Sequence, residues 1–334
     1  MTKKSTLEQV SRLIRRAHQP LLVCHVAPDG DALGSLTGLA YALRRLDQSP
    51  IAACADNIPS RFRYIPNIEA VVRSFTDPFD LVVALDCSDL RRLGDFPELP
   101  HFNQCPLINI DHHVTNVGFG DVDLVDPGAS STAEVLLRLL EHLDVSLDER
   151  LATCLLVGIV TDTRGFRTNN VTPRVMETAL RLMEAGASLP YVTQHGLDCR
   201  PTVVIRLWGA ALSRLRSEDG VIWTSIPLGM RRGVGYHGDG DAGLVSFLVS
   251  AEEADVSVVF VEQGDGRVEV GMRAGPGFDV ARFALRFGGG GHALAAGFSI
   301  SGPLDAAEGR VLEALRADLA RQRASHAQRN PQHR

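Results

Sequence analysis

Four short apolar runs, separated by segments of helical pattern, constrain the fold of this chain most strongly. The runs are PLLVCHV (20–26), SPIAACAD (49–56), FDLVVALDCSD (79–89) and CPLINIDHH (105–113). Apolar residues recur at helical spacing in 6–18, 31–46, 130–143 and 147–160. Strands that alternate with helices predict an α/β domain with a parallel, doubly wound sheet. Ligands bind such sheets at the carboxyl ends of the strands.

The second half of the chain has a different order of elements. Residues 173–217 are mainly helical in pattern, and they are followed by strand-like runs at 221–228, 254–263 and 266–274, a helix-like run at 278–287 and a glycine-rich turn at 288–291. This order predicts a smaller α+β domain across a cleft from the first. The last segment, RQRASHAQRNPQHR, has no large apolar residue and predicts disorder. We therefore expect a first domain over 1–190, a helical linker over 191–217, a second domain over 218–322 and a disordered tail over 323–334.

The charge balance limits which ligands the protein can bind. A net charge of −6 leaves no broad cationic surface, so we expect no stable binding of long nucleic acid by counterion release. The six cysteines are scattered without a C-x-x-C pair, which indicates a reducing compartment. The sequence shows no signal peptide and no apolar run of membrane-spanning length. These features predict a cytoplasmic protein that does not associate with membranes.

The first group of candidate metal ligands lies in HVAPDGDALGS, residues 25–35. His25, Asp29 and Asp31 occupy a tight loop between a predicted strand and a predicted helix, and Gly30 lets the backbone turn there. Taken alone, each residue has a structural explanation, since Asp31 could cap the helix and His25 could simply end the strand. Acidic residues elsewhere in the chain favour the functional explanation, which is that these residues bind a metal ion.

Further acidic and imidazole side chains follow other predicted elements. Asp86 ends the third apolar run, Asp111, His112 and His113 end the fourth, and Asp162 follows an apolar helix or strand in LLVGIVTDTRGF. Each of them could instead cap a turn. Because the carboxyl ends of parallel strands share one edge, we expect these carboxylates to lie close together. Repulsion between them would then require divalent cations.

The mixture of imidazole and carboxylate groups narrows the choice of metal. Oxygen-only sites suit Mg²⁺, whereas mixed nitrogen and oxygen ligands suit manganese, iron, cobalt or zinc. Because we assign no thiolate to the ligand set, Mn²⁺ is our first choice, with Mg²⁺ or Co²⁺ as alternatives. The ligands are numerous enough for two ions that share one carboxylate, as in phosphoester-cleaving two-metal sites.

The second domain contains a glycine run followed by a histidine, FGGGGHALAAG. Successive glycine amides, including those of Gly289 and Gly290, could form a concave nest for a phosphate or a carboxylate, with His292 beside it. Arg273, on the preceding predicted strand, could add a forked phosphate contact. Taken alone, the glycines are more typical of a flexible turn, and the arginine of a solvated strand residue.

Together, the motifs HVAPDGDALGS, ALDCSD, DHHVTN, GIVTDT and FGGGGHALAAG resemble those of the DHH phosphoesterase family with a C-terminal DHHA1 domain, over residues 20–322. Within that family the chain resembles the NrnA-type oligoribonucleases, which degrade very short RNA and often remove the 3′-phosphate of adenosine 3′,5′-bisphosphate (pAp). The resemblance implies hydrolysis of short oligoribonucleotides (nanoRNA) and dinucleotides such as pApA to mononucleotides, by hydroxide attack between two divalent cations. A homodimer is a further expectation.

The resemblance also implies a role for each residue. One cation would be held by His25, Asp29 and Asp86, and the other by Asp31, Asp86, His112 and Asp162, so that Asp86 bridges. His113 would face the phosphate and assist the leaving oxygen, while Asp111 would orient the histidines. The substrate would be held by Arg273, Gly289, Gly290 and His292.

Two positions depart from the family pattern. Arg164 stands where many relatives have glycine, and Ala274 stands where a serine often follows the arginine. Neither position is an expected metal ligand, so the departures bear on substrate choice and leave hydrolysis as the expected reaction.

Three alternatives stay open at this point. A manganese-dependent inorganic pyrophosphatase would share the first-domain motifs, and an exonuclease for long single-stranded DNA belongs to the same superfamily but would need an extended basic or aromatic groove. The third alternative is a nucleotide-binding regulator without catalysis, which would be expected to lack one or more ligands. The order of preference among short RNA, pAp and pApA, the direction of digestion and the oligomeric state do not follow from the sequence.

Overall fold

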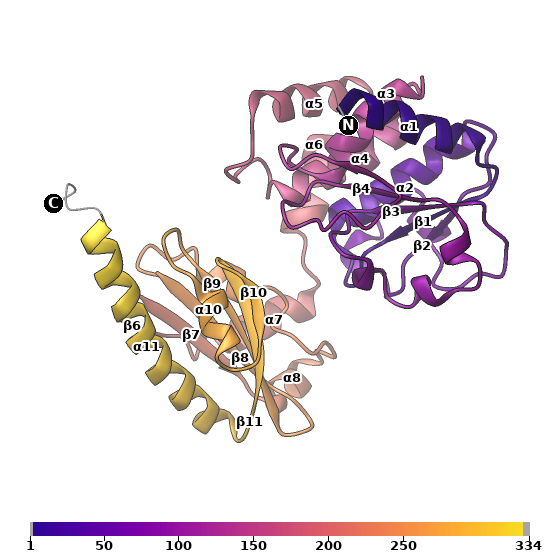
Figure 1. The fold of residues 1–334 in the computed structure, drawn as a ribbon. Coiled ribbons are helices and arrows are strands. Elements are labelled where there is room, and N and C mark those ends of the chain that lie inside the picture. Colours follow the sequence, from indigo (N-terminus) through magenta and orange to yellow (C-terminus); the bar gives the residue numbers. More distant parts are fainter. Residues whose placement is uncertain (1–2, 330–334) are drawn as a thin grey trace. The chain divides into compact units, whose positions relative to one another are not determined.

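The computed structural model describes residues 3–329 (Figure 1). The chain forms two compact units that divide between Cys199 and Arg200, inside the segment 191–217 that the sequence predicts as a linker. They are named here the N-terminal unit and the C-terminal unit. Within residues 3–329, no helix combines the length and the apolar character that a membrane span requires.

The N-terminal unit contains a five-stranded sheet whose strands all run parallel, in the order β2-β1-β3-β4-β5. The strands are β1 (Pro20–Cys24), β2 (Ile51–Ala53), β3 (Leu81–Leu85), β4 (Leu107–Asp111) and β5 (Val122–Val125). The prediction of an α/β domain with a parallel sheet is confirmed. Strand β5 is missing from the prediction because its four residues, VDLV, are too few for a clear apolar run.

Side chains of the strands alternate between two apolar layers, as the pleat of a strand requires. Leu22 and Cys24 of β1 face the helices, whereas Leu21 and Val23 face the opposite layer. The helical layer consists of α1 (Lys3–Arg16), α2 (Gly30–Arg44), α3 (Thr132–His142) and α4 (Glu149–Asp162), the last of which packs on α2 and α3. The opposite layer contains three short 3₁₀ helices, Leu90–Leu93, Phe96–Glu98 and Phe102–Gln104.

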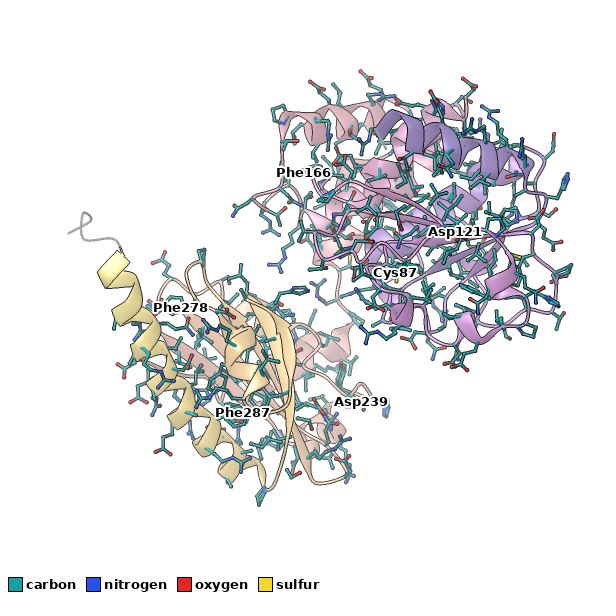
Figure 2. The ribbon with its side chains drawn as sticks, viewed as in Figure 1. Cys87, Asp121, Phe166, Asp239, Phe278 and Phe287 are labelled. Atoms are coloured by element: carbon teal, nitrogen blue, oxygen red, sulfur yellow. The ribbon has the colours of Figure 1, made fainter. Side chains whose placement is uncertain are left out.

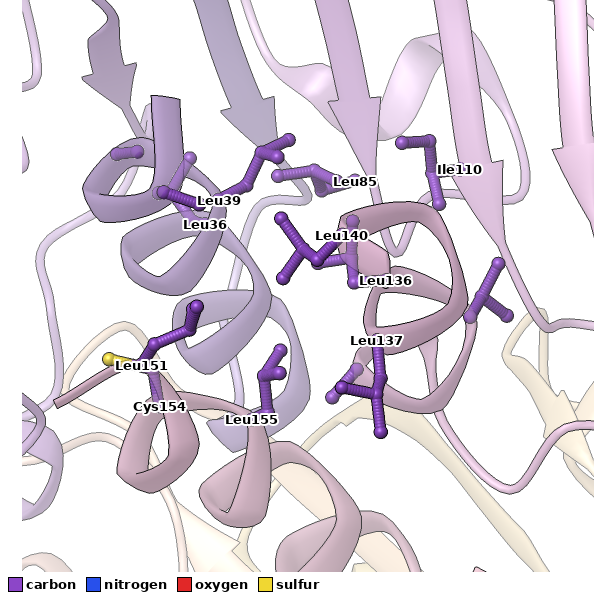
Figure 3. Close-up of a cluster of buried hydrophobic side chains, with 14 of the residues drawn as sticks. Leu36, Leu39, Leu85, Ile110, Leu136, Leu137, Leu140, Leu151, Cys154 and Leu155 are labelled. Carbon is purple, nitrogen blue, oxygen red and sulfur yellow. The ribbon is translucent and has the colours of Figure 1, made fainter. Parts of the chain in front are cut away.

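Helices α2 and α4 pack at unusually close range because glycines line the contact. A Cβ atom at Gly34 would clash with the carbonyl oxygen of Cys154, and one at Gly30 would clash with the side chain of Thr161. Leucines from α2, α3 and α4 fill the remaining space beside β3 and β4 (Figure 3). This packing brings the last turn of α4 against the first turn of α2.

The strand order contains a topological switch point between β1 and β3. The connection after β1 is helix α2 on one face of the sheet, whereas the connection after β3 is the 3₁₀ segment on the other face. Connections that leave in opposite directions separate the loops at the carboxyl ends of the two strands and open a crevice there. His25 and Asp86 are the residues that follow these two strands.

The remaining elements of the N-terminal unit complete its surface. They are the 3₁₀ helices Ser60–Phe62 and Ile68–Ala70, the helices α5 (Pro173–Glu184) and α6 (Leu189–Thr193), and a π-helical turn, Gln194–Asp198. Buried Val175, Leu182 and Val192 join α5 and α6 to the same core as α2 and α4.

The C-terminal unit contains a mixed six-stranded sheet in the order β10-β11-β9-β8-β7-β6, in which only β7 and β8 are parallel among the described strands. Its elements are α7 (Thr202–Leu212), β6 (Arg216–Glu218), β7 (Val221–Ile226), α8 (Leu228–Val234), α9 (Leu244–Leu248), β8 (Val256–Glu262), β9 (Arg267–Ala274), α10 (Val280–Leu285), β10 (Gly290–His292), β11 (Ala295–Ser301) and α11 (Leu304–Arg329). Helices α10 and α11 cover one face together with Phe278 and Phe287 (Figure 2). Helices α7 and α9 cover part of the other face. The predicted second α+β domain is confirmed.

The prediction of a disordered tail from residue 323 is wrong for residues 323–329, because α11 continues to Arg329. Polar contacts fasten the helix around residue 323, where the apolar residues end. The Gln322 amide donates to the carbonyl oxygen of Asp279 at 3.1 Å, and Arg323 forms an ion pair with Asp255. Residues 330–334 lie outside the described part of the chain.

Candidate metal centre

The six predicted metal ligands gather at the carboxyl edge of the N-terminal sheet. His25 follows β1, Asp86 follows β3, and His112 follows β4. Asp29 and Asp31 open α2, and Asp162 closes α4, a helix and not a strand. Three sets of side chains among the described residues have atoms close enough to hold a cation. The two that contain only predicted ligands, called the two groups below, are His25, Asp29 and Asp86 in the first and Asp31, His112 and Asp162 in the second; the third set is Asp86, Asp111, His112 and His113.

Asp86 belongs to the first group and also faces the histidine of the second. Its carboxylate is buried, and its two oxygens face different histidines: Oδ2 is 3.6 Å from His25 Nε2, and Oδ1 is 3.7 Å from His112 Nε2. The backbone of Asp86 is left-handed, with φ +57°, a conformation that is strained for a residue with a Cβ atom and that clusters at functional sites. With its two oxygens in these positions, the Asp86 carboxylate could bind one cation through each oxygen and so be shared by two metal ions.

His25 is oriented by the backbone. Its Nδ1 donates to the carbonyl oxygen of Val26 at 2.7 Å, which assigns a proton to Nδ1 and makes Nε2 the nitrogen that can bind a cation once it has lost its own proton. Nε2 faces Asp86 and lies 3.9 Å from Asp29 Oδ1. The half-exposed Asp29 also caps α2, since it accepts the amides of Asp31 and Ala32 at 3.1 Å. The structural explanation that Asp31 is the cap is therefore wrong.

Asp31 is fully buried and is held by a different helix. Its Oδ2 accepts the backbone amide of Thr132 at 2.6 Å, and its Oδ1 accepts that of Ala133 at 3.0 Å, so the carboxylate closes the N-terminus of α3. A Cβ atom at Gly158 would clash with Asp31 Oδ1, so glycine makes room for the carboxylate in α4. His112 Nε2 lies 3.9 Å from Asp31 Oδ2.

His112 and Asp162 complete the second group. The distance between His112 Nε2 and Asp162 Oδ2 is 3.1 Å. Burial opposes protonation of His112, but the hydrogen bond to Asp162 and the charges of Asp31 and Asp86 raise its pKa to about 10. Without a cation, this imidazole therefore carries a proton that balances the carboxylates around it.

Asp111 orients His113. Its Oδ1 accepts from His113 Nδ1 at 2.7 Å, and its Oδ2 accepts from the amide of Asn116 at 2.6 Å. The hydrogen bond to Asp111 raises the pKa of His113, while burial works in the opposite direction. Because Nδ1 is engaged, Nε2 is the nitrogen through which His113 can exchange a proton with another molecule.

The electrostatics of the carboxylates indicate a cation site. Loss of hydration within the crowded site, followed by the negative charge of Asp86, raises the pKa of both Asp29 and Asp31. Burial also opposes ionisation of Asp86, but the hydrogen bond with His25 and the charges of the three histidines lower its pKa to about 2. The donor set of imidazole nitrogens and carboxylate oxygens fits divalent cations, which would relieve the repulsion among these groups.

Two supporting residues are absent from the sequence prediction. The hydroxyl of Thr132, which is buried at the start of α3, donates to Asp86 Oδ1 at 2.9 Å. Asn116 ties Asp111 to the loop after β3, because its amide also donates to the carbonyl oxygen of Cys87 at 3.2 Å. The segment SSTAE, 130–134, carries the composition of a helix start, and this signal locates Thr132 but not its contact with Asp86.

The predicted substrate residues lie in the C-terminal unit. His292 pairs with Ala295, and Ala295 pairs with Arg273, so the three residues form one row across β10, β11 and β9. Directly paired residues project from the same face of a sheet. Their face is the one opposite α10 and α11, since Met272 and Ala274 on either side of Arg273 point into the core below these helices. Ala274, at which the chain departs from the family pattern, therefore points away from the face that carries Arg273 and His292.

The first two amides of the glycine run are already bonded within the protein. The amide of Gly288 donates to Leu285 O at 3.1 Å and that of Gly289 to Ala284 O at 3.0 Å, so both amides close the end of α10 and cannot bind a phosphate. A Cβ atom at Gly289 would also clash with Gly297 O, which is a steric reason for glycine. Gly290 belongs to strand β10. The nest prediction is wrong for Gly288 and Gly289.

Comparisons with known proteins agree with this geometry. The model of the DHH family, N-terminal domain, matches residues 20–159, and that of the DHHA1 domain matches residues 225–321. The bifunctional oligoribonuclease and PAP phosphatase NrnA of Thermus thermophilus is 35% identical over 320 residues, which span 93% of this chain and 94% of that protein. The protein of the same name from Bacillus subtilis is 29% identical, over 83% of this chain and 87% of its own.

The fold also has a close structural counterpart. The crystal structure of an exopolyphosphatase-related protein from Bacteroides fragilis superposes with a TM-score of 0.88 at 24% identity, over 96% of this chain and 98% of that chain. Both domains of the family are thus present, in the expected order and over most of the chain. The chain belongs to the DHH family and carries a C-terminal DHHA1 domain.

Proposed function

We propose that the protein is a divalent-metal-dependent phosphoesterase that hydrolyses short oligoribonucleotides and dinucleotides such as pApA to mononucleotides, and that also removes the 3′-phosphate of pAp. The observation that carries the proposal is the pair of ligand groups on either side of Asp86. The choice of substrate is supported by the relatives from Thermus thermophilus and Bacillus subtilis, both named as bifunctional oligoribonuclease and PAP phosphatase.

Two cations would occupy the two groups, with Mn²⁺ as the proposed ion because each group combines carboxylate oxygens with an imidazole nitrogen. Bound there, divalent ions would supply a water of lowered pKa and would neutralise charge on the phosphoryl oxygens. The protein would hold the metal-binding side chains in fixed positions. His25 is set by Val26 O and Asp31 by the amides of α3, so little rearrangement is needed when ions bind.

His113 is the proposed proton donor. Its Nδ1 is engaged by Asp111, and the raised pKa keeps it protonated further into the neutral range than an ordinary histidine. The proton on Nε2 could then pass to the oxygen that leaves the phosphorus, a general-acid step. Asp111 would not touch the substrate; it would hold the ring in place.

The C-terminal unit would hold the substrate through Arg273 and His292, which share one face of its sheet. A guanidinium group and an imidazole suit a terminal phosphate or the edge of a base. Short substrates follow from the charge balance, because a chain of net charge −6 has no cationic surface along which a long strand could bind.

A turnover panel tests the proposal. Purified full-length protein with Mn²⁺ is given 5′-labelled RNA of graded length from dinucleotides upward, together with pAp and inorganic pyrophosphate. We expect turnover to fall steeply with length, with pAp cleaved and pyrophosphate resistant. Preferential cleavage of pyrophosphate would favour a pyrophosphatase, and undiminished turnover of long strands would favour an exonuclease; either result would overturn the proposal.

The shared carboxylate has its own test. Asp86→Ala removes the group that faces both histidines and should abolish turnover at any Mn²⁺ concentration, because both cations lose a ligand. A control is Asp123→Ala, which removes a half-buried carboxylate from strand β5 of the same sheet and should leave Mn²⁺-dependent turnover in place. Near-normal turnover by the Asp86 variant would contradict the shared-ligand arrangement.

A further inference from the structure

An aromatic pair on the surface of the C-terminal unit takes no part in the function described so far. Trp208 of α7 and Phe247 of α9 stack with ring centroids 5.5 Å apart and an angle of 27° between the planes. Phe247 is 51% exposed. The guanidinium carbon of Arg200 lies 6.0 Å from the centroid of the Trp208 ring, within cation–π range. Two stacked rings with a cation beside them thus lie at the protein surface.

The pair is held on a rigid base. The indole N–H of Trp208 donates to the carbonyl oxygen of Asp241 at 3.3 Å. The Asp241 carboxylate accepts the amides of Gly243 and Val245 at 3.0 Å and 2.6 Å and so fixes the start of α9. Neighbouring apolar residues of α7 and α9 are buried against the sheet. The half-exposed phenyl ring of Phe247 is carried by this base.

Helix α9 rests on the sheet face that carries the predicted substrate residues. The Ser257 hydroxyl donates to Val245 O at 2.8 Å, and Ser257 is the strand partner of Arg273. The row therefore continues from Ser257 through Arg273 and Ala295 to His292.

The adjacent row of residues on that face consists of glycines in three neighbouring strands, β10, β11 and β9. Gly290 pairs with Gly297, and Gly297 pairs with Gly271. A Cβ atom at Gly271 would meet the side chain of Val245 of α9, so the bare strip ends at the helix that carries Phe247. The helices that carry the aromatic pair, α7 and α9, thus cover part of the same sheet face on which the strip lies.

We propose that Trp208 and Phe247 form a stacking platform for a nucleobase of a short oligonucleotide whose phosphate or terminal nucleotide lies over the strip between Arg273 and His292. Stacking on aromatic side chains supplies affinity that depends little on base identity. This chain needs such a source because its net charge of −6 offers little general attraction for phosphates. The inference rests on the proposed function and adds a base-binding subsite to it.

Tryptophan fluorescence provides the test, because the chain has two tryptophans and the other, Trp223, is 5% exposed. Full-length protein in a metal chelator, so that no hydrolysis occurs, is titrated with pApA and with an abasic analogue that keeps both ribose phosphates. We expect saturable quenching by pApA, loss of the quenching in Trp208→Phe, and weak binding of the abasic analogue.

Substitution of Phe247 separates stacking from general packing. Base stacking on one aromatic side chain is worth about 1–3 kcal/mol, so Phe247→Ala should raise the dissociation constant for pApA about 5-fold to 150-fold, and Phe247→Tyr should restore it. Leu180→Ala removes an apolar side chain of similar exposure, 55%, from α5 in the other unit and should leave binding unchanged. Thermal unfolding of each variant verifies that it is folded.

The outcomes distinguish the subsite from the function on which it rests. If wild-type protein hydrolyses pApA with Mn²⁺ but Phe247→Ala binds it equally well, or the abasic analogue binds as tightly as pApA, the platform is refuted and the proposed function stands. If the wild type neither binds nor hydrolyses pApA, both fall. If Phe247→Ala changes only the oligomeric state in gel filtration, the pair is a contact between copies of the chain and the inference is overturned.

Discussion

Replacing Thr132 with valine would remove one hydrogen bond from the centre of the site while keeping its shape. The Thr132 hydroxyl donates to Asp86 Oδ1 at 2.9 Å, and both residues are buried. The backbone amide of Thr132, which donates to Asp31 Oδ2, is unaffected by the substitution. Valine has nearly the volume of threonine, so the change leaves no cavity and isolates the contribution of the hydroxyl.

The expected magnitude follows from the nature of the acceptor. A hydrogen bond to a charged group contributes about 1.5–3 kcal/mol, and each 1.4 kcal/mol is about a tenfold change in an equilibrium constant. Without the hydroxyl, the Asp86 carboxylate loses one of the groups that fix its orientation between His25 and His112. We expect the affinity for Mn²⁺ to fall about 10-fold to 150-fold, and Mn²⁺-dependent turnover of pApA to shift to higher metal concentration.

Isothermal titration of metal-free protein with Mn²⁺ measures this directly, and Thr132→Ser should recover most of the affinity because it restores the hydroxyl. Thr178→Val is the matched control: Thr178 is also buried, but its hydroxyl donates to the carbonyl oxygen of Arg174 at 2.9 Å in α5. If Thr132→Val bound Mn²⁺ within twofold of wild type, the argument that α3 positions the shared carboxylate would be refuted.

Four further predictions follow from other parts of the structure. His113→Ala should lower kcat for pApA while the Mn²⁺ affinity stays near the wild-type value, because the proposed role of His113 is that of a proton donor and not of a metal ligand; calorimetry beside steady-state kinetics separates the two effects. Despite its burial, the pKa of His112 is raised to about 10 by Asp162, so cation binding must displace a proton: Mn²⁺ affinity should rise with pH, and titrations in buffers of different ionisation enthalpy should detect the released proton. In the metal-free protein, the stability that protonated His112 contributes should be fully present below about pH 6.5 and lost as the pH rises towards 10, which urea unfolding across this range would show; constant stability would contradict it. Gly289→Ala should destabilise the C-terminal unit by about 1–3 kcal/mol, since its Cβ atom would clash with Gly297 O, whereas Gly264→Ala, where a Cβ atom meets nothing within 4 Å, should not; equal melting temperatures would disprove the steric argument.

Local sequence was sufficient to predict a parallel sheet and to place the candidate ligands at one of its edges. The run LVVAL could only be a buried strand, and a residue that follows such a strand in a parallel sheet must lie at its ligand-binding edge, so Asp86 could be located without coordinates. The same reasoning located His25 and His112. It could not find β5, because four residues carry too little periodicity. It also misjudged residues 323–329, because α11 continues to Arg329, with polar contacts of Gln322 and Arg323 at the point where the apolar residues end.

Contacts between residues distant in the chain were decided only by the tertiary structure. Asp29 and Asp31 are near neighbours in sequence and look alike, yet one caps its own helix at the surface while the other is buried and closes the N-terminus of α3. The glycines at 288 and 289 predict a phosphate nest, but in the structure their amides donate to carbonyl oxygens of α10. Sequence determines which chemical groups stand at which strand ends, because the periodicity of a strand is local. The partner with which each group forms a hydrogen bond depends on how the helices pack, and helix packing is a property of the whole fold.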